Sequence, residues 1–252
     1  MKKKLILAVL LLGIISLVAL RPTYAEPIPN IDIQIGNGGT NDTSSISILL
    51  LITVISIAPA LLVLMTSFTR IIIVLGFVRT ALGTQQMPPN QVLVGLALFM
   101  TLFIMSPTIA TVNENALQPY IKGEITQTVA FEKAADPMKA FMFKQTDSKD
   151  LLLFMKYNGY TGSAKPATYS DIPLTVMVPA FAIGEMKKAF TMGFMIFIPF
   201  LVIDIVVAST LMAMGMMMLP PVMIALPFKI LLFVLVDGWY LVIKSLLVSF
   251  NT

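Results

Sequence analysis

The sequence predicts an all-α membrane protein: two long apolar helical hairpins, each bent at a Pro-Pro pair, with a small helical extramembrane region between them. Hydrophobic residues make up 57% of the 252 residues and charged residues 12%, against a charged share of about 25% in soluble domains. Long runs without any charged residue predict membrane helices, which need about 20 apolar residues. These runs are Ile46–Thr69, Thr80–Asn113, Ala189–Ile203 and Ile205–Phe228. The Pro-Pro pairs, at 88–89 and 220–221, supply no backbone N–H and therefore end helices.

The N-terminus resembles a targeting segment. The basic residues Lys2–Lys4 precede an apolar stretch, Leu5–Leu20, and the small residues Thr23 and Ala25 follow it. This order is typical of a secretory signal peptide, so we expect residues 1–25 to be removed by cleavage after Ala25. The alternative is an uncleaved anchor helix. Residues 26–45, rich in Pro, Gly, Asn, Thr and Ser, predict an extended leader.

The first hairpin is predicted at 46–112, with a break at Met87-Pro88-Pro89-Asn90 and a second helix, 92–110, that ends near Ser106-Pro107. Arg70 and Arg79 lie on either side of an apolar stretch, and residues 66–91 contain no acidic residue. The positive-inside rule therefore places this connection in the cytoplasm.

Residues 113–189 differ in kind, because they contain nine lysines and eight acidic residues. Helix starts are predicted at Asp136-Pro137 and Ser148, a helix end at Asn158-Gly159, and a further helix after Pro173. This composition indicates an extramembrane region. The second hairpin, 190–252, is predicted to bend at the second Pro-Pro pair.

The residue inventory excludes most catalytic chemistry. The chain has no histidine and no cysteine, so it lacks the usual nucleophile–base pairs and the side chains that form zinc sites. The phosphate-loop pattern GxxxxGK[ST] is absent, and no basic patch interleaved with aromatic residues suggests nucleic-acid binding. We therefore expect no enzyme activity, no cofactor and no metal site.

A small group of ionisable residues lies in or beside the apolar runs. Charges in such positions mark a function or an internal pair, because they are costly in lipid. We expect pairs between helices or between subunits that guide assembly or gating, and a proton relay is the alternative. The residues are Arg70, Arg79, Glu185, Asp204, Lys229, Asp237 and Lys244.

The stretch LMAMGMMMLPP, residues 211–221, holds five methionines in seven positions: Met212, Met214, Met216, Met217 and Met218. Gly215 interrupts them, and Pro220 and Pro221 form the predicted turn. Three interpretations are open: ordinary packing, a copper(I) site made of soft thioethers, and a pliable seal. The position before a Pro-Pro bend favours the seal, since a ring of identical hairpins would direct every copy toward one axis.

Four long blocks of the chain resemble the FliP family, the flagellar branch of the type III secretion export gate. They are SFTRIIIVLGFVRTALGTQQMPPNQVLVGLALFMTLFIMSP (67–107), VPAFAIGEMKKAFTMGF (178–194), IPFLVIDIVVASTLMAMGMMMLPP (198–221) and LPFKILLFVLVDGWYLVIKSL (226–246). The blocks RTALGTQQMPPNQVL and VLVDGW favour the flagellar branch over the injectisome branch.

The resemblance implies a multi-pass protein of the inner membrane in the flagellar basal body. It implies a pentamer-like ring of identical chains with FliQ and FliR as partners, near FlhA, FlhB and the basal-body ring. Unfolded flagellar proteins would pass through the centre, and Met216, Met217 and Met218 would match a gasket around the closed pore. A different class of function is a proton- or solute-coupled transporter that uses Asp204 and Asp237. A transporter should work as a small autonomous unit, whereas a gate subunit should purify as a ring.

Overall fold

In the computed structural model the chain divides into two units, Met1–Ile52 and Thr53–Thr252. The structure describes residues 49, 52–53, 55–57, 59–61, 63–84, 86–162, 166, 168–216 and 218–250. The predicted signal peptide, Ala25, the leader 26–45 and Met217 lie outside the described residues. The boundaries predicted for these N-terminal segments therefore stay predictions.

The first hairpin consists of α3, Phe68–Leu82, and α4, Asn90–Val112. Gly83 ends α3 in the left-handed conformation, with φ 71°, and its N–H bonds to the carbonyl of Thr80. Helix α4 begins directly after Pro89. The predicted chain break at the first Pro-Pro pair is thus confirmed.

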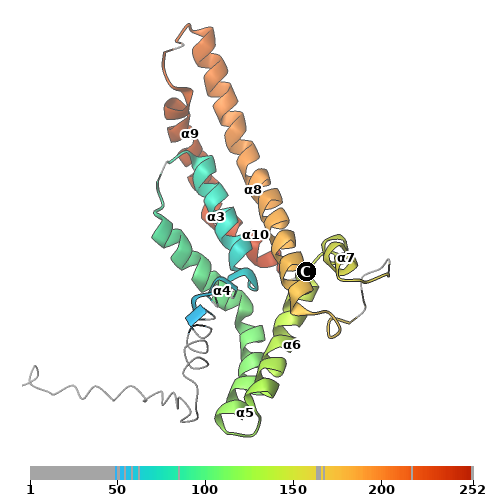
Figure 1. The fold of residues 1–252 in the computed structure, drawn as a ribbon. Helices are drawn as coiled ribbons and strands as arrows, with labels where there is room; N and C mark the ends of the chain where they lie inside the picture. The colour runs from blue at the N-terminus through green and yellow to red at the C-terminus, as the bar shows by residue number, and fades with distance from the viewer. Residues whose placement is uncertain are drawn as a thin grey trace, which may run out of the picture. The chain divides into compact units, whose positions relative to one another are not determined.

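The second hairpin consists of α8, Leu174–Ala213, and α9, Pro221–Leu235. Helix α8 has 40 residues and is therefore about 60 Å long. Helix α10, Gly238–Val248, follows α9 after a bend of 62°. In Figure 1 the α8–α9 turn lies beyond the α3–α4 turn, at the end of α8 remote from α6 and α7.

Between the hairpins lie a π-helical turn, η1 (Asn113–Leu117), and the helices α5 (Gln118–Ile121), α6 (Gln127–Gln145) and α7 (Ser148–Tyr157). Helix α7 ends at Asn158-Gly159, where Gly159 has a φ of 88°. The predicted start and end of this helix are both correct.

Two helix boundaries predicted from prolines are wrong. Pro107 lies inside α4, which continues through η1 to Ile121, and Pro137 lies inside α6. A proline removes one intrahelical hydrogen bond, and the intact turns on both sides outweigh that loss here. At Pro137 the carbonyl that loses its donor belongs to Lys133, an exposed residue.

Helix α3 organises the apolar core and packs most extensively against α8. Its fully buried residues Ile71, Val74, Leu75 and Val78 form one stripe at helical spacing. On α8, Gly193 permits close approach, because an added Cβ would lie 2.4 Å from the ring of Phe77. A second cluster joins α6, α7 and α8.

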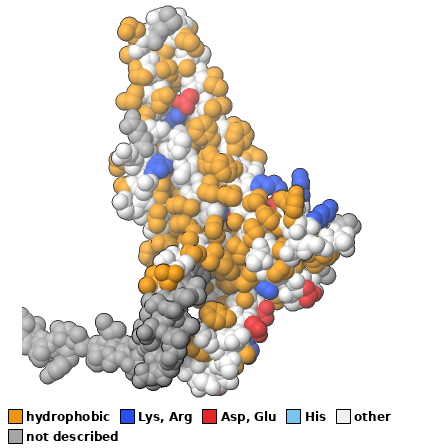
Figure 2. All heavy atoms as spheres, viewed as in Figure 1, with side chains coloured by type: hydrophobic (Ala, Val, Ile, Leu, Met, Phe, Trp, Pro, Cys, Tyr) orange, Lys and Arg blue, Asp and Glu red, His pale blue; other side chains and the backbone are white. Residues whose placement is uncertain are grey.

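The described helices fit a membrane protein. Two of them, 90–121 and 174–213, are long and apolar enough to cross a bilayer, and the bent α9–α10 pair could supply a third span. Figure 2 shows apolar side chains over most of the visible face, with charged side chains gathered mainly toward α6 and α7. Among the described residues no strand is present, so the predicted fold class is confirmed.

Candidate functional site

The turn between α8 and α9 carries the methionine cluster. Helix α8 ends at Ala213, Met214 is its C-terminal cap, and α9 begins at Pro221. Gly215 has a φ of 74°, a conformation that side chains with a Cβ adopt poorly. The amide of Met216 bonds back to the carbonyl of Leu211 at 3.0 Å, which closes the helix end.

The methionines of this turn are exposed in the single chain. Met218 keeps 98% of its accessible surface, and Met212, Met214 and Met216 are also exposed. Elsewhere the chain has both fully buried methionines, such as Met142 and Met177, and exposed ones, such as Met186 and Met195. The turn therefore presents an exposed apolar cluster at the end of the hairpin.

The methionines of the cluster are divided between the end of α8 and the loop that follows it. Met212 lies on the last helical turn, whereas Met216 and Met218 lie in the loop. The left-handed Gly215 ends the helix earlier than the prolines alone require. As a result the chain presents the thioethers of Met216 and Met218 on a loop and that of Met212 on the last helical turn.

Lys229 and Asp204 form an ion pair between the two helices of this hairpin. The Nζ of Lys229 lies 2.7 Å from the Oδ2 of Asp204, and the exposed fractions of the two side chains are 4% and 30%. A Cβ built on Gly83 would lie 3.7 Å from the same Nζ, so the ammonium group also lies beside the C-terminus of α3, where a helix favours positive charge. The expected pairing between helices is observed for these two residues.

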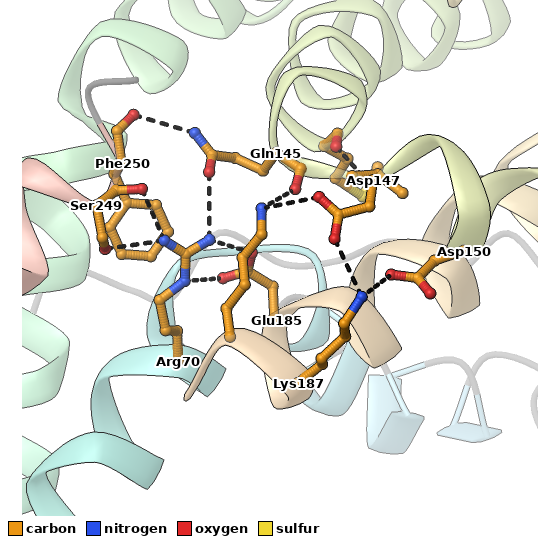
Figure 3. Close-up of polar contacts among 11 residues, drawn as sticks. Arg70, Gln145, Asp147, Asp150, Glu185, Lys187, Ser249 and Phe250 are labelled. Carbon is orange, nitrogen blue, oxygen red and sulfur yellow. Dashed lines mark hydrogen bonds and ion pairs between the residues drawn. The ribbon is translucent and has the colours of Figure 1, made fainter. Parts of the chain in front are cut away.

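Arg70 and Glu185 form a second ion pair, at the end of α3 remote from the methionine turn (Figures 1 and 3). Both side chains are almost completely buried, at 1% and 0% exposed. Nε of Arg70 donates to Glu185 Oε2 at 2.8 Å, and Nη2 donates to Oε1. This two-pronged geometry is the strong form of an arginine–carboxylate contact.

Three further residues complete the environment of Arg70. Its Nη1 donates to the carbonyl and the hydroxyl of Ser249, both at 2.9 Å, and its Nη2 donates to Gln145 Oε1 at 3.2 Å. The guanidinium carbon lies 3.8 Å from the ring centroid of Phe250. Nε2 of Gln145 in turn donates to the carbonyl of Phe250 at 3.0 Å. Helices α3, α6 and α8 and the segment after α10 are therefore joined at one point.

A surface network extends from this point, as Figure 3 shows. Lys188 donates to the carbonyl of Gln145 and lies 3.8 Å from a carboxylate oxygen of Asp147. Lys187 lies 3.3 Å from Asp147 and 3.9 Å from Asp150. The sequence pattern did not predict a role for these residues, nor for Gln145, Ser249 and Phe250. No short-range pattern marks them, because the contacts join helices far apart in the chain.

The remaining predicted charges are not brought together. Arg79 donates to Oδ1 of Asn90 across the first Pro-Pro turn. Asp237 lies exposed at the bend between α9 and α10 with a φ of 51°. Lys244 lies 5.7 Å from the ring centroid of Tyr240. Within the described part of the chain, no cluster of three His, Cys, Asp or Glu residues could hold a metal ion.

Comparison with known proteins assigns the sequence of this chain to one family. Residues 51–246 match the sequence model of the FliP family. The chain belongs to the FliP family. It is 64% identical over 210 residues to the flagellar biosynthetic protein FliP of Bacillus subtilis, which covers 83% of this chain and 94% of that protein.

Other relatives carry the same name. The flagellar biosynthetic protein FliP of Pectobacterium carotovorum is 48% identical over 237 residues, covering 94% of this chain and 91% of the relative. That of Borreliella burgdorferi is 48% identical over 216 residues, covering 84% of each. These relatives support the flagellar branch that the sequence motifs favoured.

The Asp204–Lys229 pair gives a testable expectation for this FliP-family chain. Asp204→Ala leaves the buried ammonium of Lys229 unpaired, at a cost between the roughly 1 kcal/mol of an exposed pair and the about 3–5 kcal/mol of a fully buried pair. We expect less assembled complex after detergent extraction. Asp204→Asn keeps an oxygen that accepts from Lys229, so the loss should be smaller. Normal assembly of both variants with loss of protein export would instead support a proton relay.

Proposed function

We propose that this chain is a subunit of the flagellar type III protein export gate. Identical copies form a ring, in a pentamer-like arrangement, around a channel through which unfolded flagellar proteins pass. The α8–α9 turns converge at the ring axis, and their methionines close the channel as a gasket. The subunit is required for flagellum assembly.

The observation that supports this proposal best is the exposed methionine cluster at the end of the longest described hairpin. A monomer gains nothing from leaving Met216 and Met218 uncovered, since each exposed apolar group forgoes burial free energy. Copies arranged around an axis would cover these side chains with one another. Methionine suits a passage for many different polypeptides, because its unbranched, polarizable side chain adapts to changing neighbours.

The apolar helices agree with a place in the inner membrane and in the flagellar basal body. They also agree with partners that cover apolar surface, which we propose to be FliQ and FliR, with FlhA, FlhB and the basal-body ring nearby. Lipid and such partners would together cover the exposed residues of α4: Phe99, Leu102 and Phe103 keep 75%, 58% and 71% of their accessible surface.

A proton- or solute-coupled transporter is the second candidate, and the geometry favours it less. Asp204 is paired with Lys229, while Asp237 lies at the α9–α10 bend, where its side chain forms no hydrogen bond or ion pair with other described residues. A relay needs ionisable groups within reach of one another, and these two carboxylates do not form a chain of contacts. Arg79 and Lys244 do not connect them either.

A native mass measurement of the detergent-extracted complex tests the proposal. We expect a closed ring of several copies of this chain, isolated together with other small membrane proteins. A functional species that contains one or two copies and no other protein would support the transporter instead.

A further inference from the structure

A second candidate site lies between α4 and α6, far along the chain from the methionine turn. The two helices meet near α5 and separate toward the other end of α6, as Figure 1 shows. The space between them is a groove with a volume of about 710 Å³, within the range of small-molecule sites. Its walls are one face of each helix, with Phe250 also in the lining.

The wall formed by α6 is charged. Lys133, Asp136 and Lys144 lie on the groove, and all three come from one face of the helix. Within the described part of the chain neither lysine forms an ion pair, in contrast to Lys187, Lys188 and Lys229. The two lysines and the single carboxylate of Asp136 give the groove a net charge of +1.

The other wall mixes apolar and polar side chains. Ile104 and Pro107 of α4 are apolar, whereas Thr108 and Thr111 of the same helix are polar. Phe141 of α6 and Phe250 add apolar surface to the lining. Helix α4 belongs to a segment that can cross a membrane, whereas α6 carries many charges. The groove thus lies where an apolar helix meets a charged one.

We propose that this groove binds the headgroup of an anionic phospholipid, with acyl chains along the exposed apolar surface of α4. Basic pockets beside membrane helices recognise phosphate headgroups. Lys133 and Lys144 are 11 positions apart on α6, or about 16 Å, so two extended lysine side chains can approach one phosphate from both sides. An inorganic anion would use the lysines alone, whereas a phospholipid also uses the apolar residues Ile104 and Pro107.

The test measures lipid binding to the detergent-extracted complex that contains the full chain. Phosphatidylglycerol is titrated against phosphatidylcholine, with bound lipid counted by native mass spectrometry and the midpoint of thermal unfolding recorded in parallel. Each lysine near a phosphate contributes about a fivefold gain in affinity, so Lys133→Gln with Lys144→Gln should weaken phosphatidylglycerol binding about 30-fold. Lys133→Arg with Lys144→Arg should retain binding.

Lys122→Gln with Lys149→Gln is the matched control, because both lysines are exposed and lie outside the groove. The inference is supported if the control binds phosphatidylglycerol like the unaltered complex, while phosphatidylcholine and inorganic phosphate give no comparable thermal shift. Equal binding by the groove variant and the control would overturn it. An equal shift by inorganic phosphate would also overturn it, as would a groove that binds no lipid because a partner protein fills it.

Discussion

Replacing Met216, Met217 and Met218 with alanine should make the membrane permeable to small ions and dyes and slow growth, while the ring still assembles. Each copy would lose three flexible thioethers from the proposed collar. The collar closes through many weak contacts repeated around the axis, so the loss multiplies with the number of copies. Conductance of the reconstituted ring and dye uptake by cells are the measurements.

Assembly should survive this change because the methionines do not hold the chain together. Met216 and Met218 are exposed in the single chain, and Gly215, Pro220 and Pro221, which shape the turn, are retained. We expect some protein export to continue. The matched control is Met186→Ala with Met195→Ala, which removes two exposed methionines of α8 away from the turn and should cause no leak.

Leucine at the same three positions tests whether the seal needs only apolar side-chain volume or also a flexible side chain. Leucine restores the apolar volume but has a branched, stiffer side chain than methionine. The leucine variant should therefore seal well and export less. A copper site predicts a different pattern, in which alanine abolishes metal binding and leaves ion permeability unchanged. A tight, non-leaking ring of the alanine variant would refute the gasket.

Arg70→Leu should cause the largest loss of stability among single substitutions of the polar residues described here. The change leaves the fully buried carboxylate of Glu185 without its partner, which typically costs about 3–5 kcal/mol. It also removes the donors to Gln145 and Ser249. We expect a strongly reduced amount of folded chain in the membrane and a lower midpoint of thermal unfolding.

A double variant tests whether the unpaired charge causes this loss. Arg70→Leu combined with Glu185→Leu replaces both members by apolar groups, an exchange that is often neutral in other proteins. We expect partial recovery, limited by Gln145 and Ser249, which lose a partner. If the double variant is as unstable as the sum of the two single variants, the charge argument is wrong and packing around Arg70 decides the stability.

Much of the fold could be predicted because its signals are local. Charge-free runs mark the apolar helices, and the Pro-Pro pairs mark the two turns, since they have no N–H to donate. The same local rule failed at Pro107 and Pro137, where α4 and α6 continue through a single proline. One missing hydrogen bond is a weak signal beside the packing of the whole helix.

The candidate site could be predicted only in part, for a related reason. The methionine run is visible in eleven consecutive residues, but its exposure depends on Gly215 and on how far α8 extends beyond α3 and α4. Arg70 stands out as a charge in an apolar stretch, yet nothing near it in the sequence shows that Glu185, Gln145 and Phe250 surround it. Those contacts come from tertiary packing across 75 to 180 positions.

Cross-linking at Met218 tests most directly whether the methionine turns of several copies meet at one axis. The chain has no cysteine, so Met218→Cys supplies one thiol in each copy, and Ile121→Cys, exposed at the α5 end, is the control. Each thiol can be joined to only one other thiol, so with a short bismaleimide applied to intact membranes we predict cross-linked dimers for Met218→Cys and none for Ile121→Cys. The contradicting result would be Met218→Cys chains that react with a monofunctional maleimide but remain monomers with the bismaleimide. That result would show that the turns do not converge.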